Sequence, residues 1–268
     1  MKNNYYNRLK KICTTKDSLL CIGLDFDLDK IQCNNVNDLD SLESFIKDVI
    51  DSTIDICPIF KPNFAFYEKY GPQGMVLLKN IVDYINGRSI VIADAKRGDI
   101  GNTSKNYASS IFDYYNFDAI TISPYMGSDA IEPFIKNPEK GVYLLCLTSN
   151  KSAIDFQYKF SDGTYLYEDV ANLALSLNYN NNIGLVVGAT KQENMKRIKE
   201  VAPSLTWLVP GIGAQGGDLE QSVTLSNVNK SIGIINISRS IIYAGNQSLD
   251  AIRGAALNFN EKINKILK

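Results

Sequence analysis

The sequence predicts a (β/α)8 barrel, the α/β fold also called a TIM barrel, formed by a single domain over residues 1–268. Three observations predict it. Short apolar stretches rich in β-branched residues recur eight times, stretches with helical spacing lie between them, and polar side chains follow several of the apolar stretches. Strands that alternate with helices pair in parallel, and near-continuous apolar strands are covered on both faces. A doubly wound open sheet is the alternative that shares this alternation.

The expected elements follow one another without a linker or a low-complexity tract. The eight strands are expected at residues 19–24, 56–61, 89–93, 119–123, 142–147, 183–187, 207–210 and 232–237. Apolar residues at helical spacing predict the covering helices. Three such faces are formed by Leu39, Leu42, Ile46, Val49 and Thr53, by Ala108, Ile111, Phe112 and Tyr115, and by Leu249, Ile252, Ala256, Phe259 and Ile263. The long irregular stretch 150–163 predicts a mobile lid at about residues 150–164.

Composition excludes several classes of function. A net charge of −1 without a basic block predicts no nucleic-acid partner, and no apolar stretch is long enough to cross a membrane. Five scattered cysteines and the lack of an apolar leader predict a cytoplasmic protein. The chain has no histidine, so catalysis must use lysine, acidic groups, cysteine, tyrosine or hydroxyls.

Polar residues stand where the strands of a barrel end. Because the carboxyl ends of parallel strands meet at one rim, these side chains are expected to share a site. The groups are Asp25 and Asp27 after the first strand, Lys61 and Asn63 after the second, Asp94 and Lys96 after the third, Thr148 to Asn150 after the fifth, and Ser238 and Arg239 after the eighth.

The densest charge cluster follows the third strand. Side chains alternate along a strand, so Asp94 and Lys96 are expected on the same side, roughly 6.5–7 Å apart. Asp99 lies beyond them on a glycine-flanked loop, and Lys61 on the neighbouring strand extends the cluster to an alternating Lys–Asp–Lys–Asp array. This array suits a cationic acid held beside fixed negative charge. A structural ion pair at the barrel mouth is the simpler interpretation of Asp94 and Lys96 alone.

The glycine-rich segment 211–217 follows the seventh strand and matches G-x-G-x-x-G. Dinucleotide binding would need an acidic residue about 20 positions on, and none lies between Glu220 and Asp250. A phosphate loop fits better, because backbone N–H groups, including that of Gly216, can hold an anion there. Gln215 and Arg239 can both donate to phosphate oxygens.

Two motifs carry a resemblance to a known family. The segment DAKRGDIGNT, residues 94–103, resembles the signature of orotidine 5′-phosphate decarboxylase. The segment KPNFAFYE, residues 61–68, resembles its type 2 version, found in bacteria and protozoa. The D-x-K-x-x-D core is shared with sugar-phosphate enzymes, whereas the full pair of motifs is specific. The resemblance runs from Gly23 to Arg239 and implies decarboxylation of orotidine 5′-monophosphate to UMP in de novo pyrimidine biosynthesis, without a metal or cofactor.

The resemblance also implies a role for each matching residue. Lys96 would donate a proton to C6 of the pyrimidine, and Asp94 would lie near the departing carboxylate and hold Lys96. Asp99 and Thr103 would reach the partner's site in a homodimer. The implied substrate contacts are Lys61, Asp25 and Asn63 at the ribose, Gln215, Gly216 and Arg239 at the phosphate, and Ser149 and Pro210 at the base. The residue before the arginine is commonly glycine in the family and is Ser238 here.

Three other functions use the same barrel. A magnesium-dependent lyase or decarboxylase resembling 3-hexulose-6-phosphate synthase needs an acidic ligand near the end of the second strand, where this chain has Lys61-Pro62-Asn63. A Schiff-base aldolase needs a lysine of lowered pKa rather than one flanked by carboxylates. A non-catalytic phosphate-binding barrel has no use for such a lysine. The sequence favours the decarboxylase.

Overall fold

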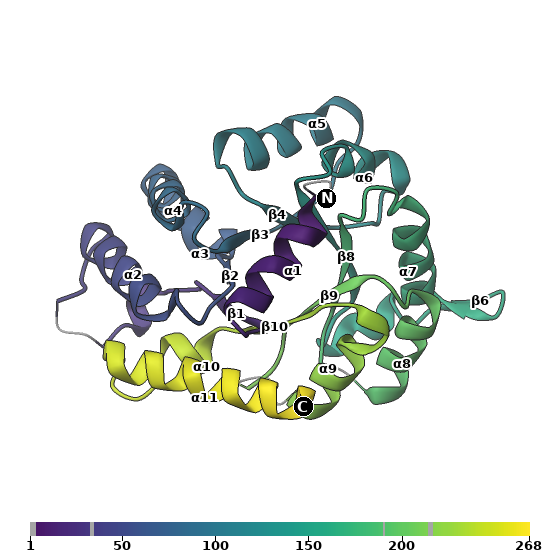
Figure 1. Ribbon diagram of the computed structural model, residues 1–268. Coiled ribbons are helices and arrows are strands. Elements are labelled where there is room, and N and C mark those ends of the chain that lie inside the picture. Colours follow the sequence, from purple (N-terminus) through teal and green to yellow (C-terminus); the bar gives the residue numbers. More distant parts are fainter. Residues whose placement is uncertain (1–3, 33–34, 190, 214–216) are drawn as a thin grey trace.

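The barrel consists of eight parallel strands that close into one sheet in the order β1-β10-β9-β8-β5-β4-β3-β2 (Figure 1). The computed structural model describes residues 4–32, 35–189, 191–213 and 217–268. The strands are β1 (Leu20–Gly23), β2 (Ile59–Lys61), β3 (Ile90–Arg97), β4 (Ala119–Ile122), β5 (Gly141–Leu147), β8 (Ile183–Val187), β9 (Thr206–Val209) and β10 (Gly233–Ile237). The pairing of β1 with β10 closes the sheet, so the barrel is confirmed and the open sheet is wrong.

Helices alternate with the strands along the chain. They are α1 (Tyr5–Thr15), α2 (Leu39–Thr53), α3 (Phe64–Glu68), α4 (Gly71–Ile85), α5 (Gly101–Ser109), α6 (Ser128–Ile135), α7 (Leu166–Leu177), α8 (Gln192–Val201), α9 (Leu219–Ser226), α10 (Arg239–Ile242) and α11 (Leu249–Leu267). Short 3-10 segments lie at η1 (Leu28–Lys30), η3 (Lys151–Asp155) and η4 (Val228–Lys230), and one π-helical turn at η2 (Ser110–Tyr114). None of the helices described is long and apolar enough to cross a membrane.

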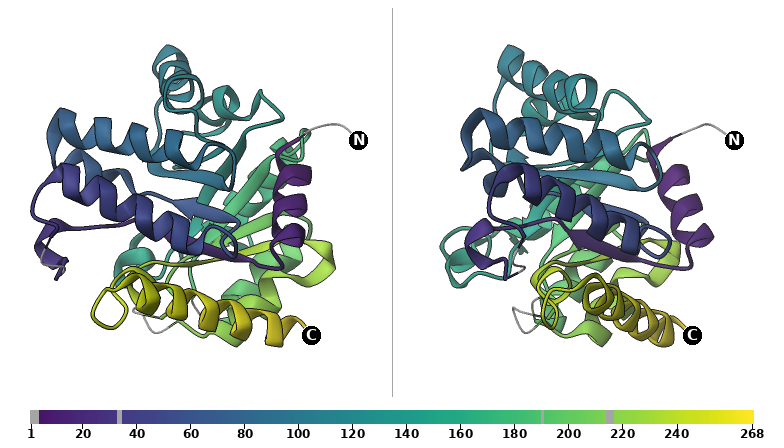
Figure 2. Two further views of the ribbon diagram at one scale, coloured as in Figure 1. Left: turned by 60° about the vertical axis from the view of Figure 1, so that its left-hand side comes forward. Right: turned by 90° about the vertical axis from the view of Figure 1, so that its left-hand side faces the viewer.

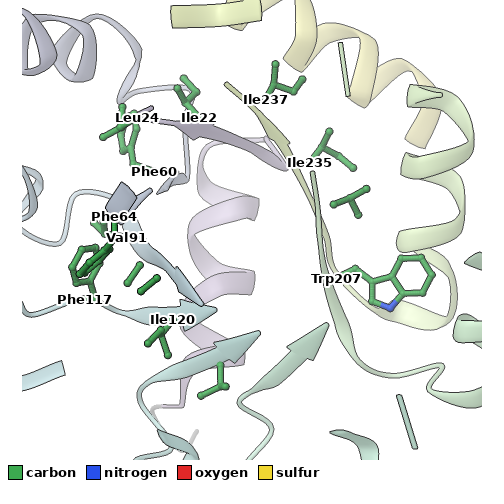
Figure 3. Close-up of a cluster of buried hydrophobic side chains, with 14 of the residues drawn as sticks. Ile22, Leu24, Phe60, Phe64, Val91, Phe117, Ile120, Trp207, Ile235 and Ile237 are labelled. Carbon is green, nitrogen blue, oxygen red and sulfur yellow. The ribbon is translucent and has the colours of Figure 1, made fainter. Parts of the chain in front are cut away.

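The main core lies between the sheet and the outer helices. Strand residues such as Ile22, Phe60 and Trp207 are fully buried and pack outward against helix faces (Figure 3). The faces expected on α2 and α11 are buried at most of their residues, such as Ile46 and Val49 on α2 and Ile252 on α11, whereas Leu249 at the start of α11 is exposed. The third expected face spans α5 and the π-helical turn η2.

Helix α1 covers the end of the barrel where the strands begin. Its buried residues Leu9 and Cys13 belong to a second apolar cluster with strand residues that point into the barrel, such as Ile90 and Ile234. The Tyr5 hydroxyl is hydrogen-bonded to that of Tyr143 at 3.0 Å. In the turned views of Figure 2, α1 lies across one end of the barrel, away from the outer helices. The other end of the barrel is therefore left for the site.

Two expectations about local structure are corrected. Strand β3 extends four residues beyond the expected end, to Arg97, and its pairing with β4 shifts register between Ala93 and Arg97. The stretch 150–163 is not irregular: it contains η3 and the strand β6 (Phe160–Ser161), which forms a hairpin with the following β7 (Thr164–Tyr165). This hairpin projects from the body of the barrel in Figure 1.

Candidate active site

A cavity of about 270 Å³ opens where the barrel strands end. Part of its lining is apolar, with Leu145, Val186 and Leu208 contributed by the neighbouring strands β5, β8 and β9. Eight of the predicted site residues line it: Asp25, Lys61, Asn63, Asp94, Lys96, Ser149, Pro210 and Arg239. The strand ends therefore bring most of the predicted site together.

The Asp94 carboxylate lies between two ammonium groups. Lys61 Nζ donates to Asp94 Oδ2 at 2.6 Å, and Lys96 Nζ donates to Asp94 Oδ1 at 2.5 Å. The side chain of Lys61 is 4% exposed, whereas that of Lys96 is 50% exposed and faces the cavity. The buried Lys61 thus holds the Asp94 carboxylate in place, and the half-exposed Lys96 presents its ammonium group to a ligand in the cavity.

Burial and charge oppose each other at this pair. Burial lowers the pKa of Lys61, but the carboxylates of Asp94 and Asp25 outweigh it and raise the pKa above its ordinary value. Burial raises the pKa of Asp94, but the Lys61 and Lys96 ammonium groups outweigh it and hold the pKa well below its usual range. Both groups stay charged through the neutral range.

The backbone of Lys96 is in a left-handed conformation, with φ of 47°. This is uncommon for a residue with a side chain and lies at the register shift of β3. The Lys96 backbone N–H donates to Thr121 Oγ1 at 3.1 Å, and the Thr121 hydroxyl donates to Asp94 Oδ1 at 3.2 Å. The strand is therefore not regular between Asp94 and Lys96, although the two side chains meet as predicted.

The Asp25 side chain is held by Ser238, the residue that follows β10. The Ser238 hydroxyl lies 2.5 Å from Asp25 Oδ2 and 3.1 Å from the carbonyl oxygen of Gly23. Asp25 Oδ1 is buried and has no hydrogen-bond partner within the described ranges. The side chain of Ser238 fills the space beside Gly23, where an added Cβ would come within 2.6 Å of Ser238 Oγ. A buried carboxylate oxygen without a donor is ready to accept from a hydroxyl group.

Asp99 and Thr103 do not line the cavity. Asp99 accepts a hydrogen bond from the backbone N–H of Ile100 at 2.8 Å, and Thr103 is exposed in the first turn of α5. Within this one chain, Asp99 therefore does not complete the expected alternating array.

The part of the cavity that is expected to bind the phosphate is lined by residues that follow β9 and β10. Pro210, Gly211 and Ile212 line the cavity after β9, and Arg239 lines it at the start of α10. Gly211 has φ of 98°, a conformation that suits glycine, and its carbonyl accepts from the N–H of Gly217 at 3.1 Å. The Arg239 guanidinium makes no hydrogen bond or ion pair to any residue in the described parts of the chain. The predicted contacts Gln215 and Gly216 lie outside the described residues.

Ser149 lies exposed on the rim after β5, beside Thr148. The Thr148 backbone N–H donates to Gln157 Oε1 at 2.8 Å. Gln157 belongs to the segment that carries the hairpin, so this segment is tied to the strand end beside Ser149.

Sequence reasoning missed two polar residues of the cavity. Thr121 on β4 and Asn236 on β10 are both buried and line the cavity floor. Asn236 Oδ1 lies 3.4 Å from the thiol sulfur of Cys21. Each is a polar residue at an inward position of an apolar strand, and that pattern was the available signal. Over the ranges described, no group of three or more Cys, Asp or Glu residues could hold a metal ion.

Comparisons with known proteins identify one family. The model of the family described as "Orotidine 5'-phosphate decarboxylase / HUMPS family" matches residues 18–253. An orotidine 5′-phosphate decarboxylase of Dehalococcoides mccartyi is 42% identical over 98% of both chains, and one of Porphyromonas gingivalis is 45% identical over 91% of this chain and 90% of that one.

Solved structures show the same likeness. The OMP decarboxylase of Leishmania donovani superposes with a TM-score of 0.86 at 37% identity, over 98% of both chains. The UMP synthase of Leishmania donovani superposes with a TM-score of 0.89 at 39% identity, over 98% of this chain and 56% of that one. The likeness thus extends over nearly the whole of this chain.

Proposed function

The chain belongs to the orotidine 5′-phosphate decarboxylase / HUMPS family, and from this premise we propose that it converts orotidine 5′-monophosphate to UMP and carbon dioxide in pyrimidine biosynthesis. The observation that carries the proposal is the Asp94 carboxylate held between Lys61 and Lys96 on the cavity wall. The arrangement places the half-exposed Lys96 ammonium beside the fixed negative charge of Asp94.

The reaction breaks the bond between C6 of the pyrimidine and its carboxylate carbon. The bonding electrons stay on C6, carbon dioxide leaves, and Lys96 Nζ gives a proton to C6. The Lys96 ammonium stabilises the negative charge that develops on C6, because it is already in place and needs no reorganisation. The half-exposed Lys96 then regains a proton from water.

Asp94 keeps this acid in position. Its lowered pKa means that it remains a carboxylate while substrate is bound, so Lys96 stays an oriented ammonium. Lys61 neutralises part of the Asp94 charge and is buried, so its geometry is fixed by packing. Together these charges form the preorganised site.

The rest of the cavity matches the parts of the nucleotide. Asp25, with its unpartnered Oδ1, Lys61 and Asn63 would bind the ribose hydroxyls. Arg239 would clamp the 5′-phosphate with a bidentate fork, together with Gln215 and Gly216. Ser149 would contact the edge of the pyrimidine and Pro210 its face.

The segment at about residues 150–164 would act as a lid over the bound nucleotide. The Thr148–Gln157 hydrogen bond joins it to the strand end that carries Ser149, and the exposed side chains of Ile154 and Phe156 are available to pack on closure. Closure would exclude water from the reacting carbon.

The working unit would be a cytoplasmic homodimer in which Asp99 and Thr103 enter the partner's site. Two observations support this. Neither residue lines the cavity of its own chain, and apolar side chains are exposed beside them, at Ile100 (56%), Tyr125 (82%) and Met126 (49%). The loops that carry these residues are joined by the hydrogen bond from Ser123 N–H to the Arg97 carbonyl oxygen at 2.8 Å.

The magnesium-dependent sugar-phosphate reaction of the same family is not favoured. Both oxygens of Asp94 are engaged by ammonium groups, and two lysines beside the cavity repel a divalent cation. Asn63 stands where that reaction needs an acidic ligand after β2.

The test follows the loss of orotidine 5′-monophosphate by ultraviolet absorbance, with excess EDTA present. We expect conversion to UMP that EDTA does not change and that Lys96→Ala lowers by at least about a thousandfold. Lys105→Ala on α5, an exposed lysine outside the cavity, is the matched control and should keep the wild-type rate. Absence of UMP from the wild-type reaction would overturn the proposal.

A further inference from the structure

We propose that Thr121 is a positioning residue that holds Lys96 and Asp94 in their working geometry, a role that rests on the proposed decarboxylation. Its hydroxyl contacts both residues: it accepts a hydrogen bond from the backbone N–H of Lys96 and donates one to Asp94 Oδ1. A single buried hydroxyl thus fixes both the main chain of the proton donor and the carboxylate that orients its side chain.

The hydroxyl takes the place of a missing backbone partner. On either side of Lys96 the pairing of β3 with β4 is kept: Ala93 pairs with Ile120 before it, and Ser123 N–H donates to the Arg97 carbonyl oxygen at 2.8 Å after it. Between them the β3–β4 register shifts, and the Lys96 N–H is directed at the Thr121 side chain. A buried N–H without an acceptor is unfavourable, so this contact stabilises the shifted register.

The contact also opposes backbone strain. Lysine in the left-handed region is disfavoured and persists only where its surroundings determine it. Without the Thr121 hydroxyl, Lys96 would lose an anchor that holds φ at 47°, and its Nζ would move relative to C6 of the substrate. Proton transfer depends steeply on such placement.

Packing alone does not require a hydroxyl at this position. Other strand residues that line the cavity are apolar, namely Leu145, Val186 and Leu208. Valine has nearly the shape of threonine, so it would fill the same space. The hydroxyl of Thr121 is therefore explained by its two hydrogen bonds, with the Lys96 backbone and with the Asp94 carboxylate.

The experiment compares Thr121→Val, which keeps the shape, with Thr121→Ser, which keeps the hydroxyl. Thr53→Val on α2 is the matched control, because Thr53 is also fully buried and its hydroxyl donates to the Val49 carbonyl oxygen at 2.8 Å, outside the cavity. The measurements are kcat and KM with orotidine 5′-monophosphate, the dissociation constant of UMP, and Tm.

We expect Thr121→Val to lower kcat by about 10- to 100-fold while KM and UMP binding change by less than about threefold. Thr121→Ser should recover most of kcat, and Thr53→Val should lower Tm alone. The inference is overturned if Thr121→Val keeps the wild-type kcat, or if kcat, UMP binding and Tm fall together in both threonine-to-valine variants.

Crystal structures of the two Thr121 variants test, without any activity measurement, whether the hydroxyl holds the Lys96 backbone. The inference expects φ of Lys96 to leave the left-handed region in Thr121→Val and to stay there in Thr121→Ser. Retention of φ near 47° with the Asp94 contact intact in Thr121→Val would overturn it. A wild-type protein that fails to make UMP would instead contradict the proposed function, while this structural result would still decide the role of Thr121.

Discussion

Lys61 and Asp94 form an ion pair of 2.6 Å in which both side chains are nearly inaccessible to water, with exposed fractions of 4% and 12%. Removing two charges from water is unfavourable, and their attraction offsets this only while both partners are present. The pair therefore links the stability of the barrel to the charge that the proposed chemistry uses.

Lys61→Met should destabilise the protein, because it leaves Asp94 with only the half-exposed Lys96 as its cationic partner. We expect the free energy of unfolding, measured by urea denaturation, to fall by about 3–5 kcal/mol. Lys69→Met is the control: Lys69 pairs with Asp27 at 2.5 Å but is 37% exposed, and its removal should change stability by less than about 1 kcal/mol. Equal effects of the two substitutions would contradict this interpretation of the pair.

The buried Lys199 should make the free energy of unfolding rise with pH above about 8. Burial lowers its pKa to about 8; its Nζ donates to Ser231 Oγ at 2.7 Å and lies 4.5 Å from the ring centroid of Trp207. Below pH 8 the folded and unfolded chains both carry the charge, and folding must bury it. Between pH 8 and the ordinary value of 10.5 the folded chain releases the proton first, so the free energy of unfolding should rise, by at most about 3 kcal/mol.

Lys199→Met should be more stable than wild type at pH 7 and lose this rise, which urea denaturation at a series of pH values measures. The exposed Lys196→Met on the same helix should follow the wild-type curve. A wild-type curve parallel to that of Lys199→Met from pH 7 to 10.5 would show that Lys199 is charged in the folded protein throughout.

Arg239→Ala should weaken binding of the phosphate. Its guanidinium is exposed on the cavity wall and has no partner within the described residues, so it is available for a bidentate contact. We expect kcat/KM to fall by about 100-fold or more, mostly through KM, with Arg239→Lys recovering only part. Arg253→Ala, which removes an arginine paired with Asp55 outside the cavity, should keep the wild-type value. A kcat/KM for Arg239→Ala equal to that of Arg253→Ala would remove Arg239 from the site.

Ser238→Ala should affect recognition of the ribose. Loss of its hydroxyl leaves Asp25 Oδ2 without its 2.5 Å donor, so the carboxylate is no longer held with Oδ1 toward the cavity. We expect UMP to bind about 5- to 10-fold more weakly, whereas an analogue lacking the ribose hydroxyl that Asp25 contacts should bind as it does to wild type. Calorimetric titration with UMP and its 2′-deoxy and 3′-deoxy analogues measures this. Equal weakening for all three nucleotides would point to a general loss of shape instead.

Mixing two inactive variants tests whether Asp99 acts across a dimer. In a heterodimer of Lys96→Ala and Asp99→Ala chains, one of the two sites regains both groups if Asp99 serves the partner. Random reassociation of equal amounts after mild denaturation should then restore about a quarter of the wild-type activity. If Asp99 served its own chain, the mixture would stay as inactive as the separate variants.

The eight strands were predictable because each is a buried run of β-branched and apolar residues. The hairpin at Phe160–Tyr165 was missed, although Asp162-Gly163 is a strong turn signal: both residues have positive φ, of 51° and 89°. Its two-residue strands are too short for a periodic pattern to identify. The register shift at Lys96 could not be predicted, because it depends on which way a hydroxyl on the neighbouring strand points.

In the candidate site, too, some features could be predicted from the sequence and others could not. Lys61, Asp94 and Arg239 were predictable because they are charged residues directly after apolar strands, where a barrel collects its functional groups. The role of Ser238 as a hydrogen-bond donor to Asp25 could not be read from the sequence. It depends on the closeness of β1 and β10, whose residues are more than 200 positions apart.

The cover that α1 forms over one end of the barrel has a consequence for the order of folding. This helix is synthesised before every strand of the barrel, yet its buried face rests on strands that span the sheet, and the Tyr5 hydroxyl meets that of Tyr143, 138 residues later. Contacts so distant in the chain form slowly. Helix α1 can therefore complete its contacts only after β10, the last strand of the barrel, has been made.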